Sequence, residues 1–120
     1  MNPRFNLWLE KEGKVVFSIW RMELLQAVAR AGSISGAAAA MDIHYRTAWQ
    51  KINEMESGLG QKLVETQVGG RRGGGAALTP LAQNLLTAFA HFSEVVEQKM
   101  DAEFTAVLAP LLNNSLDFSN

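Results

Sequence analysis

The stretch GSISGAAAAMDIHYRTAWQKINEMESGLG, residues 32–60, decides the fold. It opens with a run of small residues, passes through Asp42-Ile43, and continues as a longer amphipathic segment. Two helices separated by so few residues must cross at a steep angle, and the alanines at 37–40 permit the close approach. The spacing therefore predicts a helix–turn–helix whose second helix covers residues 44–59.

The second helix of this motif has an apolar and a polar face. At about 100° per residue, four apolar side chains fall on one stripe: Ala48, Ile52, Met55 and Leu59. The opposite face carries arginine, glutamine and asparagine, which can pair with guanine or adenine edges in the major groove. An ordinary solvated helix also has a polar face. Only the short helix before this one and the strand–loop–strand after it favour DNA binding over a merely solvated surface.

The N-terminal residues of the second helix of such a motif reach deepest into the groove. The side chains expected to contact DNA are His44, Tyr45, Arg46, Thr47, Gln50, Lys51 and Asn53, with Ser33 and Ser35 at the entry of the motif. Trp49 lies on the flank of this face, where we expect it to pack against neighbouring strands rather than to stack on sugar or phosphate.

The segment before the motif predicts a hairpin and a helix. Residues 5–17, FNLWLEKEGKVVF, carry apolar residues on both sides of Glu12-Gly13, which is typical of two short strands joined by a tight turn. Ser18 is the expected N-cap of the following helix, and Gly32 is its expected end.

The segment after the motif predicts a strand, a glycine-rich loop and a strand between residues 63 and 78. Half of the ten glycines lie in VGGRRGGGAALT, residues 68–79. Glycine allows close backbone approach, and its N–H groups can meet phosphate oxygens. The expected wing contacts to DNA are Gly70, Arg71, Arg72 and Gly73. A nucleotide-binding loop is disfavoured, because it requires lysine and then serine or threonine after its last glycine.

The last predicted helix starts at Pro80, with Thr79 as its cap. Its apolar residues recur every three or four positions over about 30 residues, which is more than a small core needs. A partner helix is the natural cover, so we expect a homodimer; a separate effector protein docked on the stripe is the alternative. The expected interface is Leu85, Phe89, Phe92, Val96, Met100, Phe104 and Val107.

Composition bounds the remaining possibilities. The 120 residues suit one domain, expected over residues 1–112, with a frayed tail at 113–120. Residues 1–72 hold ten Lys and Arg against seven acids, or +3, and residues 73–120 hold one against five, or −4. A basic front of this kind fits a surface that faces a polyanion.

Several function classes are disfavoured. The chain lacks cysteine, which excludes disulfides and thiol catalysis. No apolar run approaches about 18 residues, so we expect a cytoplasmic protein without a membrane span. His44 and His91 lie far apart, and neither a nucleophile–base pair nor a metal-spaced cluster stands out. We therefore expect neither an enzyme nor a metal site.

The motif GSISGAA and the terminal LG resemble the winged helix–turn–helix of LysR-type regulators. Over residues 5–110 the chain more closely resembles the N-terminal DNA-binding domain of the molybdate-responsive ModE regulators, through YRTAW, INEME and GGRRGGGAALT. The resemblance implies a mainly α fold with small β-hairpins, and a winged helix–turn–helix with a long C-terminal dimerisation helix. It also implies a bacterial transcriptional regulator that binds a palindromic operator in double-stranded DNA as a homodimer.

Two features depart from the ModE pattern. His44 replaces the serine usual at the start of the recognition helix. Molybdate-sensing ModE regulators also carry C-terminal oxyanion-binding domains, and this chain ends before one could begin. The resemblance therefore implies a stand-alone DNA-binding domain without a cofactor. A molybdate-responsive regulator with a separate sensor is the alternative.

Overall fold

The structure, a computed structural model, describes the backbone of residues 1–67 and 74–118. The chain divides into two compact units. One is Leu7–Phe89, and the other combines Met1–Asn6 with Ala90–Asn120. The first unit carries the predicted helix–turn–helix.

An N-terminal hairpin opens the first unit, as predicted. Strands β1 (Trp8–Lys11) and β2 (Lys14–Ser18) pair antiparallel. Glu12 and Gly13 between them have φ values of 54° and 80°. Two consecutive positive φ values match the twist that a two-residue hairpin turn must have.

Helix α1 (Ile19–Ala31) has the two ends that the sequence predicts. The Ser18 hydroxyl accepts a hydrogen bond from the Arg21 backbone N–H at 3.0 Å, which satisfies one of the free donors of the first turn. Gly32 ends the helix in the left-handed region, with φ 74°. Its N–H donates to the Val28 carbonyl at 2.8 Å.

The helix–turn–helix itself consists of α2 (Ile34–Ala40) and α3 (Tyr45–Leu59). Ala37 and Ala38 are buried between the helices, as close packing requires. The predicted inner stripe of α3 is confirmed, because Ala48, Ile52 and Met55 are buried and Leu59 is half-buried.

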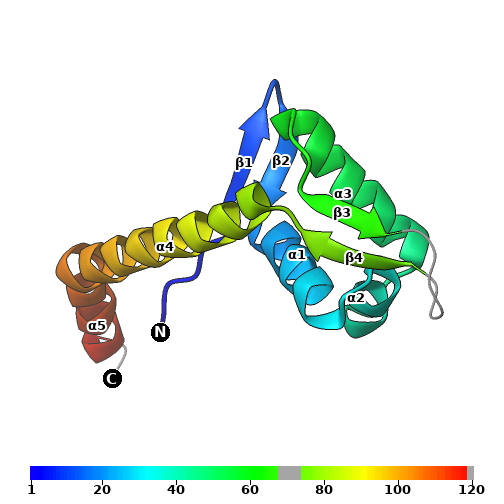
Figure 1. The fold of residues 1–120 in the computed structure, drawn as a ribbon. Coiled ribbons are helices and arrows are strands. Elements are labelled where there is room, and N and C mark those ends of the chain that lie inside the picture. The colour runs from blue at the N-terminus through cyan, green and yellow to red at the C-terminus, as the bar shows by residue number, and fades with distance from the viewer. Residues whose placement is uncertain (68–73, 119–120) are drawn as a thin grey trace. The chain divides into compact units, whose positions relative to one another are not determined.

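The predicted wing is the antiparallel hairpin of β3 (Val64–Gln67) and β4 (Gly75–Leu78). Figure 1 shows this hairpin beside α1, α2 and α3. The Ala76 N–H donates to the Gly32 carbonyl at 2.8 Å, which joins β4 to the turn between α1 and α2. The predicted DNA contacts Gly70, Arg71, Arg72 and Gly73 fall in segment 68–73, outside the described residues.

The core of the first unit lies where the helices, the N-terminal hairpin and the first turns of α4 (Pro80–Glu103) meet. The Phe17 and Phe89 rings pack edge to face at its centre, with centroids 4.8 Å apart. Among the described residues, the largest fully buried side chains are Phe17, Leu24, Leu25, Val28, Met55 and Leu63.

Helix α4 begins as predicted and ends differently. The Thr79 hydroxyl accepts a hydrogen bond from the Ala82 N–H at 3.2 Å, and Pro80 is the first helical residue. After Glu103 the chain forms a π-helical turn, η1 (Phe104–Leu108), and continues as α5 (Ala109–Phe118). The prediction of one uninterrupted helix is therefore wrong, and most of the segment expected to be frayed is helical. A π turn adds one residue per turn, so it shifts the side chains that follow around the helix.

Candidate nucleic-acid interface

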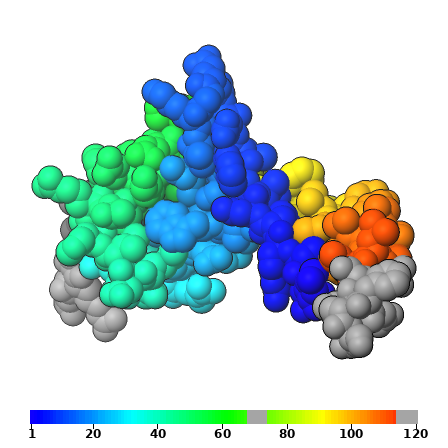
Figure 2. All heavy atoms as spheres, turned by 180° about the vertical axis from the view of Figure 1, so that it is seen from behind, coloured from blue at the N-terminus to red at the C-terminus, as the bar shows by residue number. Residues whose placement is uncertain are grey.

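The N-terminal half of α3 is open to solvent. His44, Tyr45, Arg46 and Gln50 are exposed, whereas Thr47, Lys51 and Asn53 are half-buried. Figure 2 shows α3, in green tones, at the surface of the unit beside the N-terminal hairpin in blue. The polar face predicted for this helix is thus free over its first two turns.

A partly buried ion pair ties one flank of α3 to α1. Arg21 is only 7% exposed and donates to a Glu54 carboxylate oxygen at 3.0 Å and to the Lys51 carbonyl at 3.3 Å. The hydrogen bond from Arg21 lowers the pKa of Glu54 below its usual value. The Lys51 ammonium lies 3.5 Å from the same carboxylate, so this predicted DNA contact is engaged within the protein.

Arg21 was missed by the sequence reasoning, although a signal for it exists. It precedes buried Leu24, Leu25 and Val28 by three, four and seven residues, which is the spacing of one helical face. From the sequence, Trp20, Leu24 and Val28 are expected to share the inner face of this helix, yet Trp20 is exposed. A charged residue at a core position indicates a paired charge, and here the partner is Glu54, whose side chain is 40% exposed.

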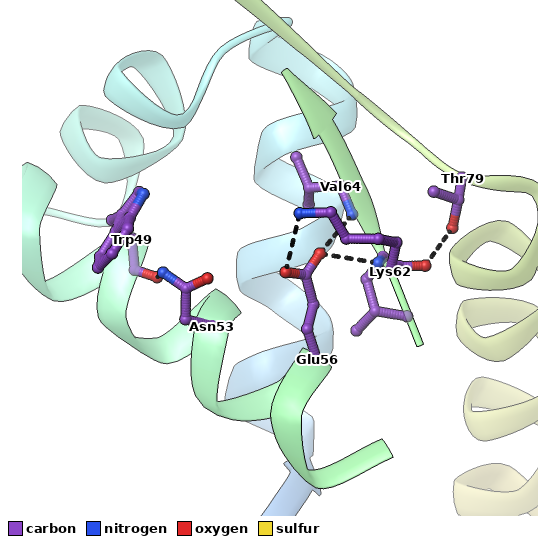
Figure 3. A network of polar contacts seen from close by, with 7 residues as sticks. Trp49, Asn53, Glu56, Lys62, Val64 and Thr79 are labelled. Atoms are coloured by element: carbon purple, nitrogen blue, oxygen red, sulfur yellow. Dashed lines mark hydrogen bonds and ion pairs between the residues drawn. The ribbon is translucent and has the colours of Figure 1, made fainter. Parts of the chain in front are cut away.

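Glu56 ties the opposite flank of α3 to the wing. One carboxylate oxygen accepts hydrogen bonds from the backbone N–H groups of Leu63 at 2.9 Å and Val64 at 3.1 Å. The other oxygen lies 3.5 Å from the Lys62 ammonium. Figure 3 shows Glu56 reaching from α3 to these residues, and the Thr79 hydroxyl donating to the Lys62 carbonyl. The base of the wing is thereby fixed against both α3 and the start of α4.

The start of α3 has no side-chain cap. His44 has an extended backbone conformation, and its side chain makes no capping hydrogen bond. Ser18, Ser33 and Thr79, by contrast, accept bonds from the first turns of α1, α2 and α4. Uncapped N–H groups and the positive end of the helix dipole favour a phosphate at this end.

Ser33 and Ser35, the predicted contacts at the entry of the motif, have different surroundings. The Ser33 hydroxyl accepts the Gly36 N–H at 2.9 Å and so serves as the cap of α2. Ser35 is exposed on the first turn of that helix. Only Ser35 presents its side chain freely to a ligand.

Trp49 is 51% exposed, although we expected it to pack against neighbouring strands. It borders a groove of about 800 Å³ together with Val15 and Val16 of the N-terminal hairpin. On the other side it borders a smaller pocket with Val64 and Thr66 of the wing. Its ring thus lies between the two hairpins without being enclosed by either.

The predicted dimer stripe is only partly available. Phe89 is 3% exposed and belongs to the core, and Leu85 packs partly against it. Val96, Met100 and Phe104 are half-buried, whereas Phe92 and Val107 are exposed. Only the part of the stripe that follows Phe89 in the sequence is therefore available to a partner. Phe89 itself is buried in the core and is not available to an interface.

In the part of the chain that the structure describes, no helix combines the length and apolar character needed to cross a membrane. Within residues 1–67 and 74–118, no cluster of three His, Asp or Glu side chains is arranged to hold a metal ion.

The free face of α3, its two anchored flanks and the wing define a domain of the winged helix–turn–helix class. Residues 19–83 match the family described as "Bacterial regulatory helix-turn-helix protein, lysR family", and the chain belongs to that family. The fold class and the resemblance to LysR-type and ModE regulators are thus confirmed.

Curated relatives share this region. The chain is 35% identical over 101 residues to the DNA-binding transcriptional dual regulator ModE of Escherichia coli, an alignment covering 84% of this chain and 38% of ModE. It is 42% identical over 69 residues to the molybdenum-pterin-binding protein MopA of Rhodobacter capsulatus, covering 58% and 26% respectively. The chain therefore spans well under half the length of these relatives.

Solved structures support the fold. The crystal structure of the CbnR DBD–DNA complex has a TM-score of 0.55 and 23% identity, covering 72% of this chain and 94% of that one. The BenM DBD in its complex with benA site 1 DNA has a TM-score of 0.54 and 20% identity, covering 75% and 96%. At these identities the likeness establishes the shared architecture.

Proposed function

We propose that the chain binds double-stranded DNA in the cytoplasm through α3, and that it regulates transcription without catalytic activity. The observation that carries this proposal is the contrast between the two faces of α3. Ala48 and Met55 are fully buried, whereas Arg46 and Gln50 are exposed between two anchored flanks. A recognition helix needs this combination, because base contacts require side chains held at a fixed depth in the groove.

The wing supplies the second proposed contact. Its first strand, β3, is anchored to α3, because Glu56 accepts hydrogen bonds from the backbone N–H groups of Leu63 and Val64. Arg71 and Arg72 lie between β3 and β4 in the sequence and would contact the DNA backbone or the neighbouring minor groove. Such contacts add affinity for any sequence and make it sensitive to salt.

We propose a homodimer formed through the second half of α4 and the segment that follows. Phe92 is 48% exposed, and Val107 and Leu111 are also exposed. A second copy would bury these side chains and would present two copies of α3 to DNA. Two-fold symmetry then requires a roughly palindromic site, with half-sites one helical turn or a multiple of it apart.

A response to molybdate would need a sensor outside the described residues. MopA is named as a molybdenum-pterin-binding protein, but the similarity covers only 26% of its length. The residues matched by the family are those of the helix–turn–helix and the wing. We therefore assign no molybdate site to them.

Selection of bound fragments from genomic and random duplexes tests these proposals together. It is carried out with and without molybdate at a concentration on the order of micromolar. We expect a palindromic consensus, and an affinity that falls steeply as salt is raised. Recovery of no preferred sequence would refute specific binding. An affinity independent of salt would favour the alternative, in which α4 docks on an effector protein.

Arg46→Ala tests base reading directly. It should lower the preference for one base pair by about 1–3 kcal/mol, because arginine pairs with guanine through two hydrogen bonds. Lys14→Ala is the matched control, since it removes one exposed positive charge from β2 rather than from α3. Equal weakening of all sequences by Arg46→Ala would show that Arg46 contacts only the backbone of DNA.

A further inference from the structure

Two large aromatic side chains stand exposed one turn apart on α3. Tyr45 is 54% exposed and Trp49 is 51% exposed. Both lie in the first two turns of the helix, where a recognition helix reaches deepest into the major groove. Exposed apolar surface at a predicted binding face indicates a ligand with an apolar feature of its own.

The rings present apolar surface rather than hydrogen-bonding groups fixed within the protein. Among the described residues, neither the Tyr45 hydroxyl nor the Trp49 indole N–H makes a hydrogen bond to another side chain or backbone group. The hydrogen bond found at Trp49 involves its backbone and not its ring: the Asn53 side-chain amide donates to the Trp49 carbonyl at 3.1 Å. Figure 3 shows the Asn53 amide turned toward the helix backbone beneath Trp49.

Tyr45 and Trp49 differ from scattered surface aromatics in their position on α3 and in the pocket that lies beside Trp49. Trp49 follows Tyr45 by four residues, so the two side chains are neighbours on one side of the helix. Trp49 also borders the pocket formed with Val64 and Thr66 of the wing. Arg46 and Gln50 lie directly beside the pair, so a duplex bound to those polar side chains also meets the rings.

The chemistry of the major groove limits what the rings can recognise. Base edges there carry hydrogen-bond donors and acceptors and a single apolar group, the C5-methyl of thymine. We propose that Tyr45 and Trp49 form an apolar surface that recognises thymine methyl groups in each half-site. This inference rests on the proposed DNA binding and adds the base type that this part of α3 selects.

Replacement of thymine by deoxyuridine isolates the proposed contact. Deoxyuridine keeps the base pair and its hydrogen-bonding pattern and removes only the methyl group. Burial of one methyl group corresponds to about a fourfold change in Kd. We therefore expect about fourfold weaker binding of the native chain when a contacted thymine is replaced, and no change at thymines outside the contact.

The probes are the duplex of highest affinity recovered by the selection described above and its single deoxyuridine derivatives. Each is titrated with the native chain, with Tyr45→Ser and with Trp49→Gln. The penalty at one or more thymines should disappear in each variant, whereas Trp49→Phe should retain it. Trp8→Gln is the matched control, because it removes an exposed tryptophan from β1 and should leave every penalty unchanged. Circular dichroism and urea unfolding of the variants check that helix content and stability are retained.

The outcomes separate this inference from the function on which it rests. A duplex bound specifically, but equally well with deoxyuridine at every position, would overturn the aromatic contact and leave DNA recognition standing. Penalties that persist in Tyr45→Ser and Trp49→Gln would also overturn it. Failure to recover any preferred duplex would instead refute the proposed function and this inference with it.

Discussion

Replacement of Glu56 by alanine should destabilise the chain by removing the anchor between α3 and the wing. The side chain is 11% exposed, and one of its oxygens accepts two backbone N–H groups, those of buried Leu63 and Val64. Hydrogen bonds to a charged group contribute about 1.5–3 kcal/mol each, and buried donors left without a partner carry a penalty of similar size. The ion pair with Lys62 adds little, because that lysine is largely exposed.

The expected loss is about 2–4 kcal/mol, less than the sum of two full bonds because water can enter the space that alanine leaves. Glu56→Gln keeps an acceptor oxygen without the charge and should lose about half as much, since charge-assisted bonds are roughly twice as strong as neutral ones. Urea unfolding followed by circular dichroism measures both losses as changes in the free energy of unfolding.

Glu65→Gln is the control for charge alone, because Glu65 is exposed on β3. It should change the free energy of unfolding by less than about 0.5 kcal/mol. A Glu56→Ala variant as stable as this control would refute the anchoring role. Equal losses in Glu56→Ala and Glu56→Gln would show that the acceptor oxygen contributes nothing without its charge.

Three further changes test other parts of the structure. Gly58→Ala would place a Cβ atom 2.5 Å from a Val16 methyl group and should lower the free energy of unfolding by about 1–3 kcal/mol. In a Val16→Ala background the same change should be less costly. If the losses of stability from the two changes simply add, the clash is refuted. The pKa of Glu54 is lowered by Arg21, so its contribution to stability is full above its ordinary pKa of 4.5 and is lost as pH falls through the lower folded pKa. The difference in unfolding free energy between the native chain and Glu54→Gln should therefore shrink on acidification, and a difference independent of pH would contradict this role. Phe92→Glu should convert a homodimer into monomers in sedimentation experiments, because it places a charge in the apolar interface; a dimer of unchanged affinity would exclude this interface.

Local sequence signals predicted most elements of the first unit. Ser18, Gly32 and Thr79 have the chemistry of helix ends, and the structure uses each of them in that way. The inner stripe of α3 followed from a period of 3.6 residues, because one face of that helix is packed along its length. These predictions succeeded where a single helix or turn contains the whole signal.

Features that depend on partners distant in sequence were not predicted. Arg21 and Glu54 are 33 residues apart, and only the packing of α1 on α3 brings them together. Phe89 fits an apolar interface by its spacing, yet Phe17 from the first hairpin covers it. Periodicity identifies which face of a helix is apolar, but it does not tell which surface covers that face.

The bond between the Ala76 N–H and the Gly32 carbonyl has a consequence for how related proteins can diverge. It fixes β4 close to the end that adjoins segment 68–73, and the Glu56 contacts fix the start of β3. The length and charge of the connecting segment can therefore vary without loss of these bonds. In the proposed mode of binding, substitutions in this segment would change how strongly a descendant binds DNA and how steeply that binding falls with salt, while the bonds that anchor the two strands are kept.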